Sequence, residues 1–505
     1  METQSSMKKR KLSFPTAFTV LFIVLILSAI LTFIIPAGSY VKLSYDSDKS
    51  IFTTLNPSGE ITELPATQQT LDKLNVKATL DKFTDGSITK PIAIPGTYEK
   101  ITQNPQGLKE IITSPIEGVY DTIDIIMFVF IIGGVIGVLN FSGAFNAGIA
   151  SLSRITKGKE YMLIVFVTFL IALGGTTFGL AEETIALYPI LVPIFLAAKY
   201  DVLVCIAAIY MGTSVGTMFS TVNPFSAVIA SNAAGINFTD GLGFRAIALI
   251  IALAITLIYI LKYAKKVKND PSKSLVYDLK DHIEEKFASH GEAPKLTLKL
   301  KLMLIIFAST FAIMIYGVSS QGWWFTEMTA LFLVSGIIIG VLSGMGEKQF
   351  VNKFVAGAGD LISVALVIGV ARSINIVLEN GGIADSILNF CSTSISGMNS
   401  NIFIILMLIV FIVLGFFIPS SSGLAVLSIP IMAPLADSVG LPREVIISSY
   451  LYGIGLIAFI TPTGLILATL SMVDVTYDKW LKFIMPLMGY LAIFSAIMLL
   501  IQVNL

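Results

Sequence analysis

Apolar stretches long enough to cross a lipid bilayer recur along this 505-residue chain. A helix needs about 20 mostly apolar residues to span the hydrocarbon core, so this recurrence restricts the fold to a bundle of membrane helices. The composition agrees, because charged residues make up 13% of the chain, against about 25% in a soluble domain. The clearest predicted spans are 15–36, 119–139, 244–264, 301–318, 325–344, 358–378 and 482–503.

Charge and rare side chains exclude several classes of function. Lys and Arg together number 33, as do Asp and Glu, so the net charge argues against a nucleic-acid partner. Cys205 and Cys391 lie in or beside apolar runs, which excludes a disulfide framework and a cysteine metal site. His282 and His290 lie in a charged linker, so imidazole chemistry inside the membrane is excluded. We expect neither an enzyme nor a bound cofactor.

Two apolar regions, 161–235 and 401–472, do not have the pattern of simple spans. In each, an apolar helix runs into a small polar tip, a short helix with two prolines follows, and a polar residue and a proline interrupt the next span. The arms around each tip run to about 15 residues, near 23 Å, which is short of the roughly 30 Å core. We therefore predict re-entrant hairpins at 161–198 and 401–436, and broken helices at 202–235 and 444–472.

The two regions resemble copies of one segment. Matching residues recur at a nearly constant offset of 238 to 241, and the pairs include Pro189 and Pro430, Pro193 and Pro434, Gly212 and Gly453, Asn223 and Thr461, and Gly118 and Gly357. When basic loops are placed in the cytoplasm, the second copy enters the membrane from the opposite side. Inverted repeats with broken helices are typical of secondary transporters.

This scheme predicts an all-α integral membrane protein with about nine full spans plus two hairpins. It lies in the cytoplasmic (plasma) membrane, with the N-terminus in the cytoplasm and the C-terminus outside. Its parts are a cytoplasmic N-terminus (1–14), a first repeat (15–264) with an extracytoplasmic loop containing some strand (40–116), a cytoplasmic linker (265–300), a connecting span (301–318) and a second, inverted repeat (323–505).

Polar side chains at the tips and breaks are the candidate substrate ligands. Asn223-Pro224 and Thr461-Pro462 each place a proline at the first turn of a second half-helix, whose positive end would attract a carboxylate at the midplane. The alternative is that the hydroxyls bond their own backbone. The polar candidates are Thr176, Thr177, Asn223, Ser420, Ser421, Ser422, Thr461 and Thr463, with a Na⁺ site near Gly175, Asn223, Ser421 and Thr461.

Three charged residues complete the predicted site. Glu182 and Glu183 follow the first tip within apolar sequence, where ionisable groups mark pathways, proton relays or counter-ions. The alternative is a solvated tip. Arg372, midway in 358–378, could hold a substrate carboxylate or pair with a buried acid. The tryptophans Trp323, Trp324 and Trp480 are expected at the membrane interface.

Several segments carry a resemblance to a known family. IIPAG, PGTYEKITQNPQGLKEIITSPIEGVYDTIDIIMFVFIIGGVIGV, GLAEETIALYPILVPIF, IPSSSGLAVLSIPIMAPLAD and YDKWLKFIMPL resemble the YfcC family, a relative of the DcuC anaerobic C4-dicarboxylate carriers in the ion transporter superfamily. The resemblance covers essentially the whole chain. It implies scaffold and transport parts in each repeat, an elevator-type motion and a homodimer. It also implies a substrate among dicarboxylates, short-chain fatty acids, or arginine and ornithine. The Ser-Asn-Thr tips of the superfamily are matched only in part by Gly174–Thr177 and Ser420–Gly423.

These observations favour a secondary active transporter of a small carboxylate-bearing metabolite. Helix ends that attract a carboxylate, together with two acids, favour a substrate that carries both signs, an amino acid, with a basic amino acid such as arginine or ornithine preferred. That it moves by exchange is what the family resemblance implies. A C4-dicarboxylate or short-chain carboxylate carrier coupled to Na⁺ or H⁺ is the alternative. A channel is disfavoured, because no predicted span shows the continuous polar stripe that a pore needs. An intramembrane hydrolase is a remote alternative, because without a histidine in the membrane only Glu or Lys could serve as the base beside a serine.

Overall fold

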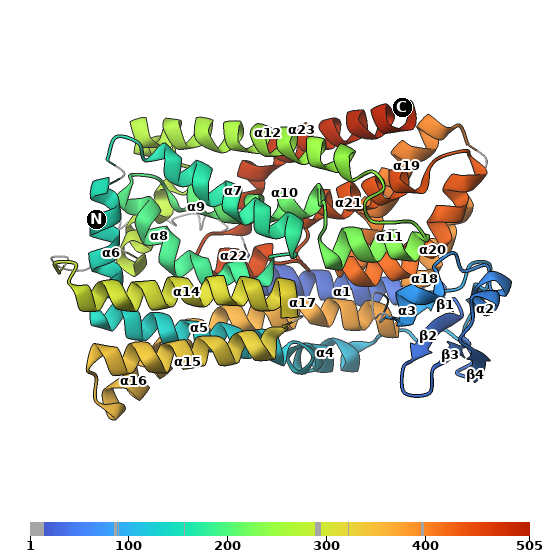
Figure 1. The fold of residues 1–505 in the computed structure, drawn as a ribbon, viewed down its shortest axis with the longest axis horizontal. Helices are drawn as coiled ribbons and strands as arrows, with labels where there is room; N and C mark the ends of the chain where they lie inside the picture. The colour runs from blue at the N-terminus through green and yellow to red at the C-terminus, as the bar shows by residue number, and fades with distance from the viewer. Residues whose placement is uncertain are drawn as a thin grey trace, which may run out of the picture.

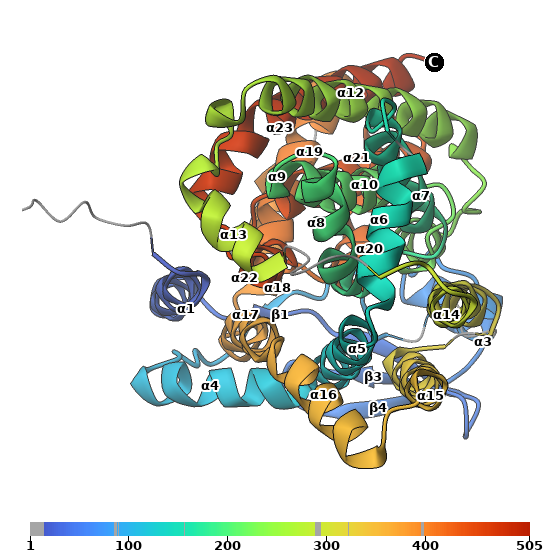
Figure 2. The same ribbon diagram turned by 90° about the vertical axis from the view of Figure 1, so that its left-hand side faces the viewer.

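Long apolar helices run side by side along one axis in the computed structural model (Figure 1), and Figure 2 views several of them end-on. The structure describes residues 15–84, 88, 90–155, 157–287, 294–321, 323–394 and 398–505. Within these residues, nine helices are long and apolar enough to cross a membrane. They are α1 (Ala17–Ile34), α5 (Ile123–Ser142), α12 (Leu242–Asn269), α14 (Leu298–Gln321), α15 (Phe325–Ser343), α17 (Ile362–Asn380), α19 (Ser400–Phe417), α20 (Ser421–Ser438) and α23 (Tyr477–Val503).

Seven of these nine helices overlap the seven predicted spans, and α19 and α20 are the arms of the predicted second hairpin. Local signals fix their ends. The hydroxyl of Thr16 accepts a hydrogen bond from the backbone N–H of Thr19 at the start of α1. Gly143 and Gly344, both with positive φ, end α5 and α15.

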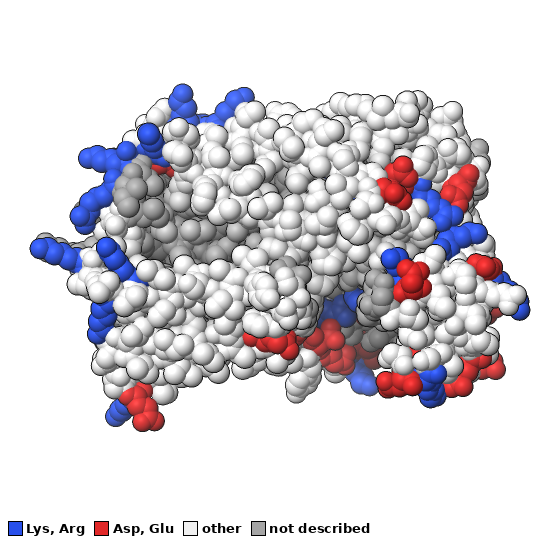
Figure 3. All heavy atoms as spheres, viewed as in Figure 1, with Lys and Arg blue, Asp and Glu red and all other residues white. Residues whose placement is uncertain are grey.

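The surface of the bundle is suited to lipid. Large apolar side chains such as Ile34, Ile250 and Val341 face outward, the last with 75% of its surface exposed. In Figure 3 most of the middle of the molecule carries no charge, with a few charged side chains along its lower edge; Lys and Arg predominate at the left end, and charges of both signs lie at the right end. A largely uncharged band between two charged ends is the expected surface of a membrane protein.

A small β unit follows α1. An antiparallel sheet has the strand order β4-β3-β2-β5, and β1 pairs with β6. Leu43, Phe52, Leu71, Phe83 and Ile92 fill its core. The elements are β1 (Gly38–Ser39), β2 (Lys42–Asp46), β3 (Ile51–Leu55), β4 (Ile61–Pro65), α2 (Gln68–Lys73), α3 (Leu80–Thr84), β5 (Ile92–Ala93) and β6 (Glu99–Lys100). The predicted loop 40–116 therefore contains strand, but it ends earlier than predicted, because α4 (Leu108–Asp121) is helical from Leu108.

One order of helices occurs twice in the chain. The first set is α4, α5, α6 (Ala144–Ile155), α7 (Tyr161–Thr177), α8 (Tyr188–Ala197), α9 (Val202–Ile206), α10 (Gly212–Met218), α11 (Ile229–Ala234) and α12. The second set is α16 (Glu347–Gly359), α17, α18 (Ala384–Ser394), α19, α20, α21 (Arg443–Ala458), α22 (Ile466–Met472) and α23. In Figure 1, α6 and α8 lie toward the left end, whereas α18, α19 and α20 lie toward the right end.

Glycines allow the closest helix crossings between the two sets. A Cβ atom at Gly118 on α4 would collide with the carbonyl of Gly369 on α17, and one at Gly357 on α16 would collide with the carbonyl of Gly133 on α5. In each crossing, the first helix of one set packs against the second helix of the other set: α4 crosses α17, and α16 crosses α5. Small residues let membrane helices approach closely enough for backbone contact.

Three local expectations are corrected by the structure. Helix α7 continues through Thr177, so the first tip is 178–181 rather than Gly174–Thr177. Helices α19 and α20 have 18 residues each, about 27 Å at 1.5 Å per residue, and are longer than the predicted arms. Pro224 begins a helical turn as predicted, but Pro462 lies in a turn before α22, which begins at Ile466.

The expectation of an interfacial Trp480 is wrong. Its side chain has no exposed surface, and its indole N–H donates to the carbonyl of Phe459 at 2.8 Å. The physical reason is that the interrupted helix leaves a carbonyl without a helical partner, and a buried tryptophan N–H supplies one.

Candidate functional site

A cavity of about 460 Å³ lies where both hairpin tips, both helix breaks and α17 meet. The first tip contributes Gly179 and Ala181, the 3-10 helix that follows it contributes Glu182 and Glu183, and the second tip contributes Ser420, Ser421 and Ser422. The breaks contribute Asn223, Phe225, Thr461 and Thr463, and α17 contributes Arg372 and Asn375. Segments far apart in sequence therefore line one cavity.

Asn223, at the first helix break, links that break to helix α7 of the first hairpin by hydrogen bonds. Its Nδ2 donates to the carbonyl of Gly175 at 2.9 Å, and its Oδ1 accepts from the backbone N–H of Phe225 at 2.9 Å. Gly179 at the tip has a φ of +78°, and a Cβ there would lie 2.9 Å from Asn223 Oδ1. The tip thus needs glycine both for its left-handed backbone and for the approach of Asn223.

The second tip is held in a similar way. The Ser420 hydroxyl accepts from the backbone N–H of Gly423 at 3.2 Å and caps the start of α20. The Ser421 hydroxyl donates to the carbonyl of Phe225 at 3.2 Å, which joins the second tip to the first break. At the second break, the hydroxyls of Thr461 and Thr463 lie 2.8 Å apart.

Buried donors satisfy the carbonyls that the breaks expose. Arg245, the fourth residue of α12, has no exposed surface and donates to the carbonyls of Ser220 at 3.0 Å and Phe238 at 2.6 Å. Trp480, the fourth residue of α23, plays the corresponding part at the second break. Unpaired backbone groups are costly in a membrane, so these two residues stabilise the broken helices.

Glu182 and Glu183 begin a short 3-10 helix directly after the first tip, and both line the cavity. A carboxylate oxygen of Glu183 accepts from the backbone N–H of Ala181 at 3.0 Å. In the described part of the chain, no Lys, Arg or His nitrogen lies within 4.0 Å of either carboxylate. Two half-buried acids in the chamber thus lack a protein counter-charge.

Arg372 has acidic partners but still faces the chamber. Its guanidinium is paired with Asp121 of α4 and, at 3.3 Å, with Glu379 of its own helix. Arg372 thus pairs with acids that are exposed rather than buried, and it also lines the cavity. That it holds a substrate carboxylate stays a prediction.

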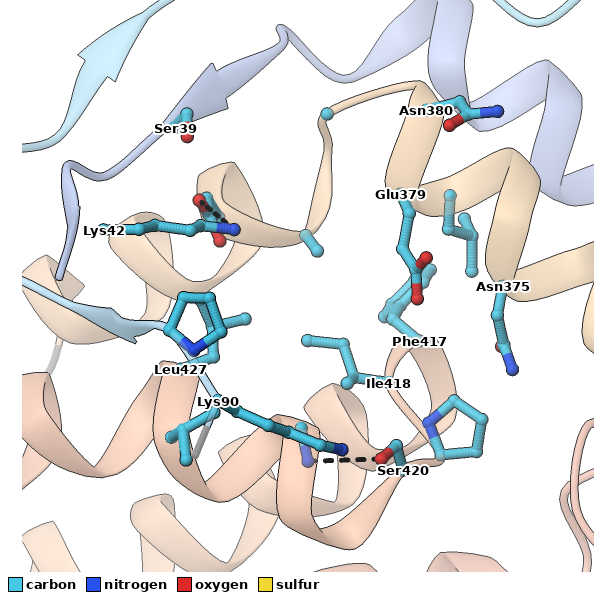
Figure 4. A pocket seen from close by; sticks show the side chains of 18 of the residues that line it. Ser39, Lys42, Lys90, Asn375, Glu379, Asn380, Phe417, Ile418, Ser420 and Leu427 are labelled. Atoms are coloured by element: carbon cyan, nitrogen blue, oxygen red, sulfur yellow. Dashed lines mark hydrogen bonds and ion pairs between the residues drawn. The ribbon is translucent and has the colours of Figure 1, made fainter. Parts of the chain in front are cut away.

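A second cavity of about 420 Å³ lies against the first, on the side of the β unit (Figure 4). Ser39 and Lys42 from the β unit, and Glu379 and Asn380 from α17, are among its lining residues. The two cavities share six residues, which are Lys90, Arg372, Asn375, Ile418, Pro419 and Ser420. We call the first the central cavity and the second the outer cavity.

The structure brings most of the predicted site residues to the central cavity. Nine line it, namely Glu182, Glu183, Asn223, Arg372, Ser420, Ser421, Ser422, Thr461 and Thr463. Thr176 and Thr177 do not: the Thr176 hydroxyl accepts from the backbone N–H of Thr221 at 2.9 Å, and the Thr177 hydroxyl donates to the carbonyl of Leu173 at 2.6 Å. Substrate binding by the nine, and Na⁺ binding near Gly175, stay predictions.

Four residues at or near the site were missed by sequence reasoning. Lys90 lies in the polar loop and therefore gave no sign of a site within the membrane. Arg245 lies at the start of a predicted span, where a basic residue is ordinarily taken to face the membrane surface. Asn375 lines both cavities, and its Oδ1 is buried with no hydrogen-bond partner among the described residues. Trp324 lines the central cavity, where its ring lies 5.4 Å from that of Phe225. Of these four, only Asn375 could have been identified from the sequence, because it is a polar residue within an apolar helix.

Nearly the whole chain matches one protein-family model. The model described as DcuC, C4-dicarboxylate anaerobic carrier, matches residues 14–504. The chain belongs to the DcuC family. It is 48% identical over 505 residues to an uncharacterized protein of Haemophilus influenzae, covering 99% of each chain. It is 30% identical to YfcC of Escherichia coli, described as a candidate basic amino acid antiporter, covering 97% of this chain and 96% of that one.

Two solved structures were also matched by this DcuC-family chain. MtrF of Neisseria gonorrhoeae, described among antimetabolite efflux pumps, is 17% identical, with 97% of this chain and 96% of that chain covered and a TM-score of 0.39. The YdaH transporter of Alcanivorax borkumensis is 13% identical, with 97% and 98% covered and a TM-score of 0.39. These two likenesses carry no further argument. The family shows that the chain is an integral membrane transporter and not an enzyme.

Proposed function

We propose that this transporter moves a basic amino acid of the arginine or ornithine type, by exchange, through the central cavity. The observation that carries the proposal is the pair of acids, Glu182 and Glu183, which line that cavity with no Lys, Arg or His nitrogen of the described residues within 4.0 Å of either carboxylate. A carboxylate in a low-dielectric site needs a counter-charge, a proton or a metal ion. A basic amino acid brings two cationic groups that can supply it.

The charges along the central cavity favour a zwitterion. Lys90 and Arg372 lie on the side shared with the outer cavity, which Glu182 and Glu183 do not line. The start of α20 at Ser421 also faces the chamber and carries the positive end of a helix dipole. A carboxylate is therefore favoured on the outer side and a cationic side chain on the side of the two acids.

Neighbouring groups suit a guanidinium in particular. Trp324 and Phe225 present aromatic rings to the same chamber, and a guanidinium stacks well on aromatic faces. The resemblance to YfcC, whose description names basic amino acids, supports the same substrate class.

A C4-dicarboxylate is the second candidate. The family description names this class, and Lys90, Arg372 and the serines of the second tip could hold two carboxylates. Glu182 and Glu183 would then bind coupling protons or lie near a coupling Na⁺. In either case we propose that α7–α8 and α19–α20 are re-entrant hairpins of two inverted repeats, in a homodimer that moves its hairpins as an elevator does. The opposite placement of these helices in Figure 1 supports the inversion.

Charge-removing variants test the proposal. Glu182→Gln and Glu183→Gln keep the shape and remove the charge, with Glu117→Gln on the exposed surface of α4 as the matched control. We expect at least one cavity variant to weaken arginine binding to the purified protein by about 10-fold or more, since charged hydrogen bonds contribute about 1.5–3 kcal/mol. Binding of citrulline, which lacks the charge, should change much less.

The other outcomes identify the alternatives. Succinate exchange that persists in the glutamine variants while its pH dependence disappears indicates a proton-coupled dicarboxylate carrier. A changed Na⁺ dependence indicates a Na⁺-coupled carrier. If both cavity variants match Glu117→Gln in every assay, the two acids are solvated groups, and the proposed substrate class loses its support.

A further inference from the structure

Lys90 lines the central cavity although it lies outside the apolar helices. It lies in the polar segment between α3 and β5, yet its Nζ donates to the hydroxyl of Ser422 in the second tip at 2.7 Å, across 332 residues of chain. Figure 4 shows its side chain extending past Leu427 toward Ser420. It is one of the six residues that line both cavities.

Lys90 differs from the other cations at these cavities in the partner of its charged group. Lys42 lies 3.9 Å from Asp385, and Arg372 is paired with Asp121 and Glu379. No carboxylate oxygen within the described segments lies within 4.0 Å of the Lys90 ammonium, whose recorded partner is the neutral Ser422 hydroxyl. Lys90 is exposed overall, but partial desolvation of its ammonium and then the nearby Arg372 charge lower its pKa from the ordinary value, an effect that the carboxylate of Glu379 opposes.

An ammonium held in this way favours an anion beside it. Three N–H donors and a positive charge make lysine a strong carboxylate ligand, whereas a hydroxyl satisfies only one donor and no charge. Ser420 and Ser421, at the start of α20, border the same point and add a helix N-terminus. A substrate carboxylate placed here would replace a weak partner of Lys90 with a strong one.

We propose that Lys90 is a specificity-determining residue that binds the substrate carboxylate at the junction of the two cavities. This inference rests on the proposed function, because it assigns one end of the same substrate. The Lys90–Ser422 contact then holds the β-unit loop against the second tip until a carboxylate takes its place. Both the selection for carboxylates and the positioning of the tip follow from one side chain.

Matched variants separate this role from a purely structural one. Lys90→Met keeps most of the aliphatic stem and removes the charge, and Lys90→Arg keeps the charge. Ser422→Ala removes the contact within the protein but leaves the ammonium in place. Binding of arginine and of argininamide, which has an uncharged amide in place of the carboxylate, is measured by titration calorimetry on the purified full-length protein.

The expected pattern is specific to the carboxylate. Lys90→Met should weaken arginine binding by about 10-fold or more while leaving argininamide binding within about 3-fold of the parent. Lys90→Arg and Ser422→Ala should keep the preference for arginine over argininamide. The proposal is overturned if Lys90→Met weakens both ligands equally, which indicates a structural peg, or weakens neither.

The test also distinguishes a failure of the proposed function. If the parent binds succinate and not arginine, the basic amino acid assignment is wrong, and the same variants are compared with succinate and its monoamide. A larger loss for succinate in Lys90→Met then supports the carboxylate role, and equal losses overturn it. A parent that binds neither arginine nor succinate overturns both proposals.

Discussion

Polar side chains at and beside the tips and breaks have two different roles, which their contacts distinguish. Asn223 uses both ends of its amide on the protein itself, whereas Glu182 and Glu183 present carboxylates to the chamber. Thr176 and Thr177 use their hydroxyls within the first hairpin and the neighbouring break. Residues of the first kind position the central cavity, and residues of the second kind are the ones that we propose to contact a substrate.

Replacing Asn223 should weaken both folding and binding. Asn223→Ala leaves the carbonyl of Gly175 and the N–H of Phe225 without their partners, and each buried unpaired group costs about 1–3 kcal/mol. We expect a lower melting temperature in detergent and an affinity reduced about 5- to 150-fold. Asn223→Asp keeps the acceptor for Phe225 and should lose less. A melting temperature and affinity unchanged in Asn223→Ala would contradict the assigned role.

The serine and threonine hydroxyls should differ in their effect on transport. Ser421→Ala removes the link between the second tip and Phe225 at the central cavity, so we expect weaker substrate binding, by about 5-fold or more. Thr177→Val removes a hydroxyl that bonds the carbonyl of Leu173 away from the cavity. It should leave transport kinetics unchanged. Equal effects of the two variants would mean that the central cavity is not the site.

At the scale of elements, each broken helix depends on a buried donor near the start of the last helix of its set. Arg245 on α12 and Trp480 on α23 both occupy the fourth helical position and bond carbonyls at a break. Neither lines the central cavity. Their substitution should therefore change stability more than selectivity.

Arg245 offers the sharper test of this rule. Arg245→Met leaves the carbonyls of Ser220 and Phe238 without their buried donor, so we expect unfolding to become easier by about 3 kcal/mol. The ratio of arginine to citrulline affinity should stay that of the parent. The exposed Arg154→Met is the control for loss of an arginine, and thermal unfolding in detergent is the measurement. An unchanged melting temperature in Arg245→Met would refute the capping role.

The sequence predicts elements better than contacts. Apolar length located the seven uninterrupted spans, and the glycine and proline pattern located both interrupted regions within a few residues. The first tip was misplaced by about one helical turn, because Gly174 and Gly175 suggest a break where α7 in fact continues. Those glycines serve helix packing instead, since a Cβ at Gly175 would lie 2.6 Å from the carbonyl of Thr213.

The chemistry of the site was predictable only where apolar sequence surrounds a polar residue. Glu182, Glu183 and Arg372 stand out for that reason. Lys90 does not, because it lies in a polar loop and meets Ser422 only through the fold. Trp480 was misassigned because the sequence does not show that Phe459 leaves a carbonyl for it.

For the whole molecule, the proposed inversion of the two repeats predicts which surfaces face which compartment. Single cysteines at the exposed positions Glu60, Lys157, Glu285 and Ser438 sample both ends of the molecule. The background carries Cys391→Ser, while Cys205 is fully buried. A membrane-impermeant maleimide added to intact cells should label positions 60 and 438, and should label 157 and 285 only after permeabilisation. Labelling of position 438 solely from the cytoplasmic side would disprove the inversion.

The most direct test of the account is exchange by the parent protein in proteoliposomes. Vesicles are loaded with ornithine, and uptake of labelled arginine is compared with uptake of labelled succinate in vesicles loaded with fumarate. We expect arginine uptake that requires internal ornithine and stops in at least one of Glu182→Gln and Glu183→Gln, with little succinate uptake. Rapid succinate uptake without arginine uptake would contradict the assignment of the central cavity to a basic amino acid.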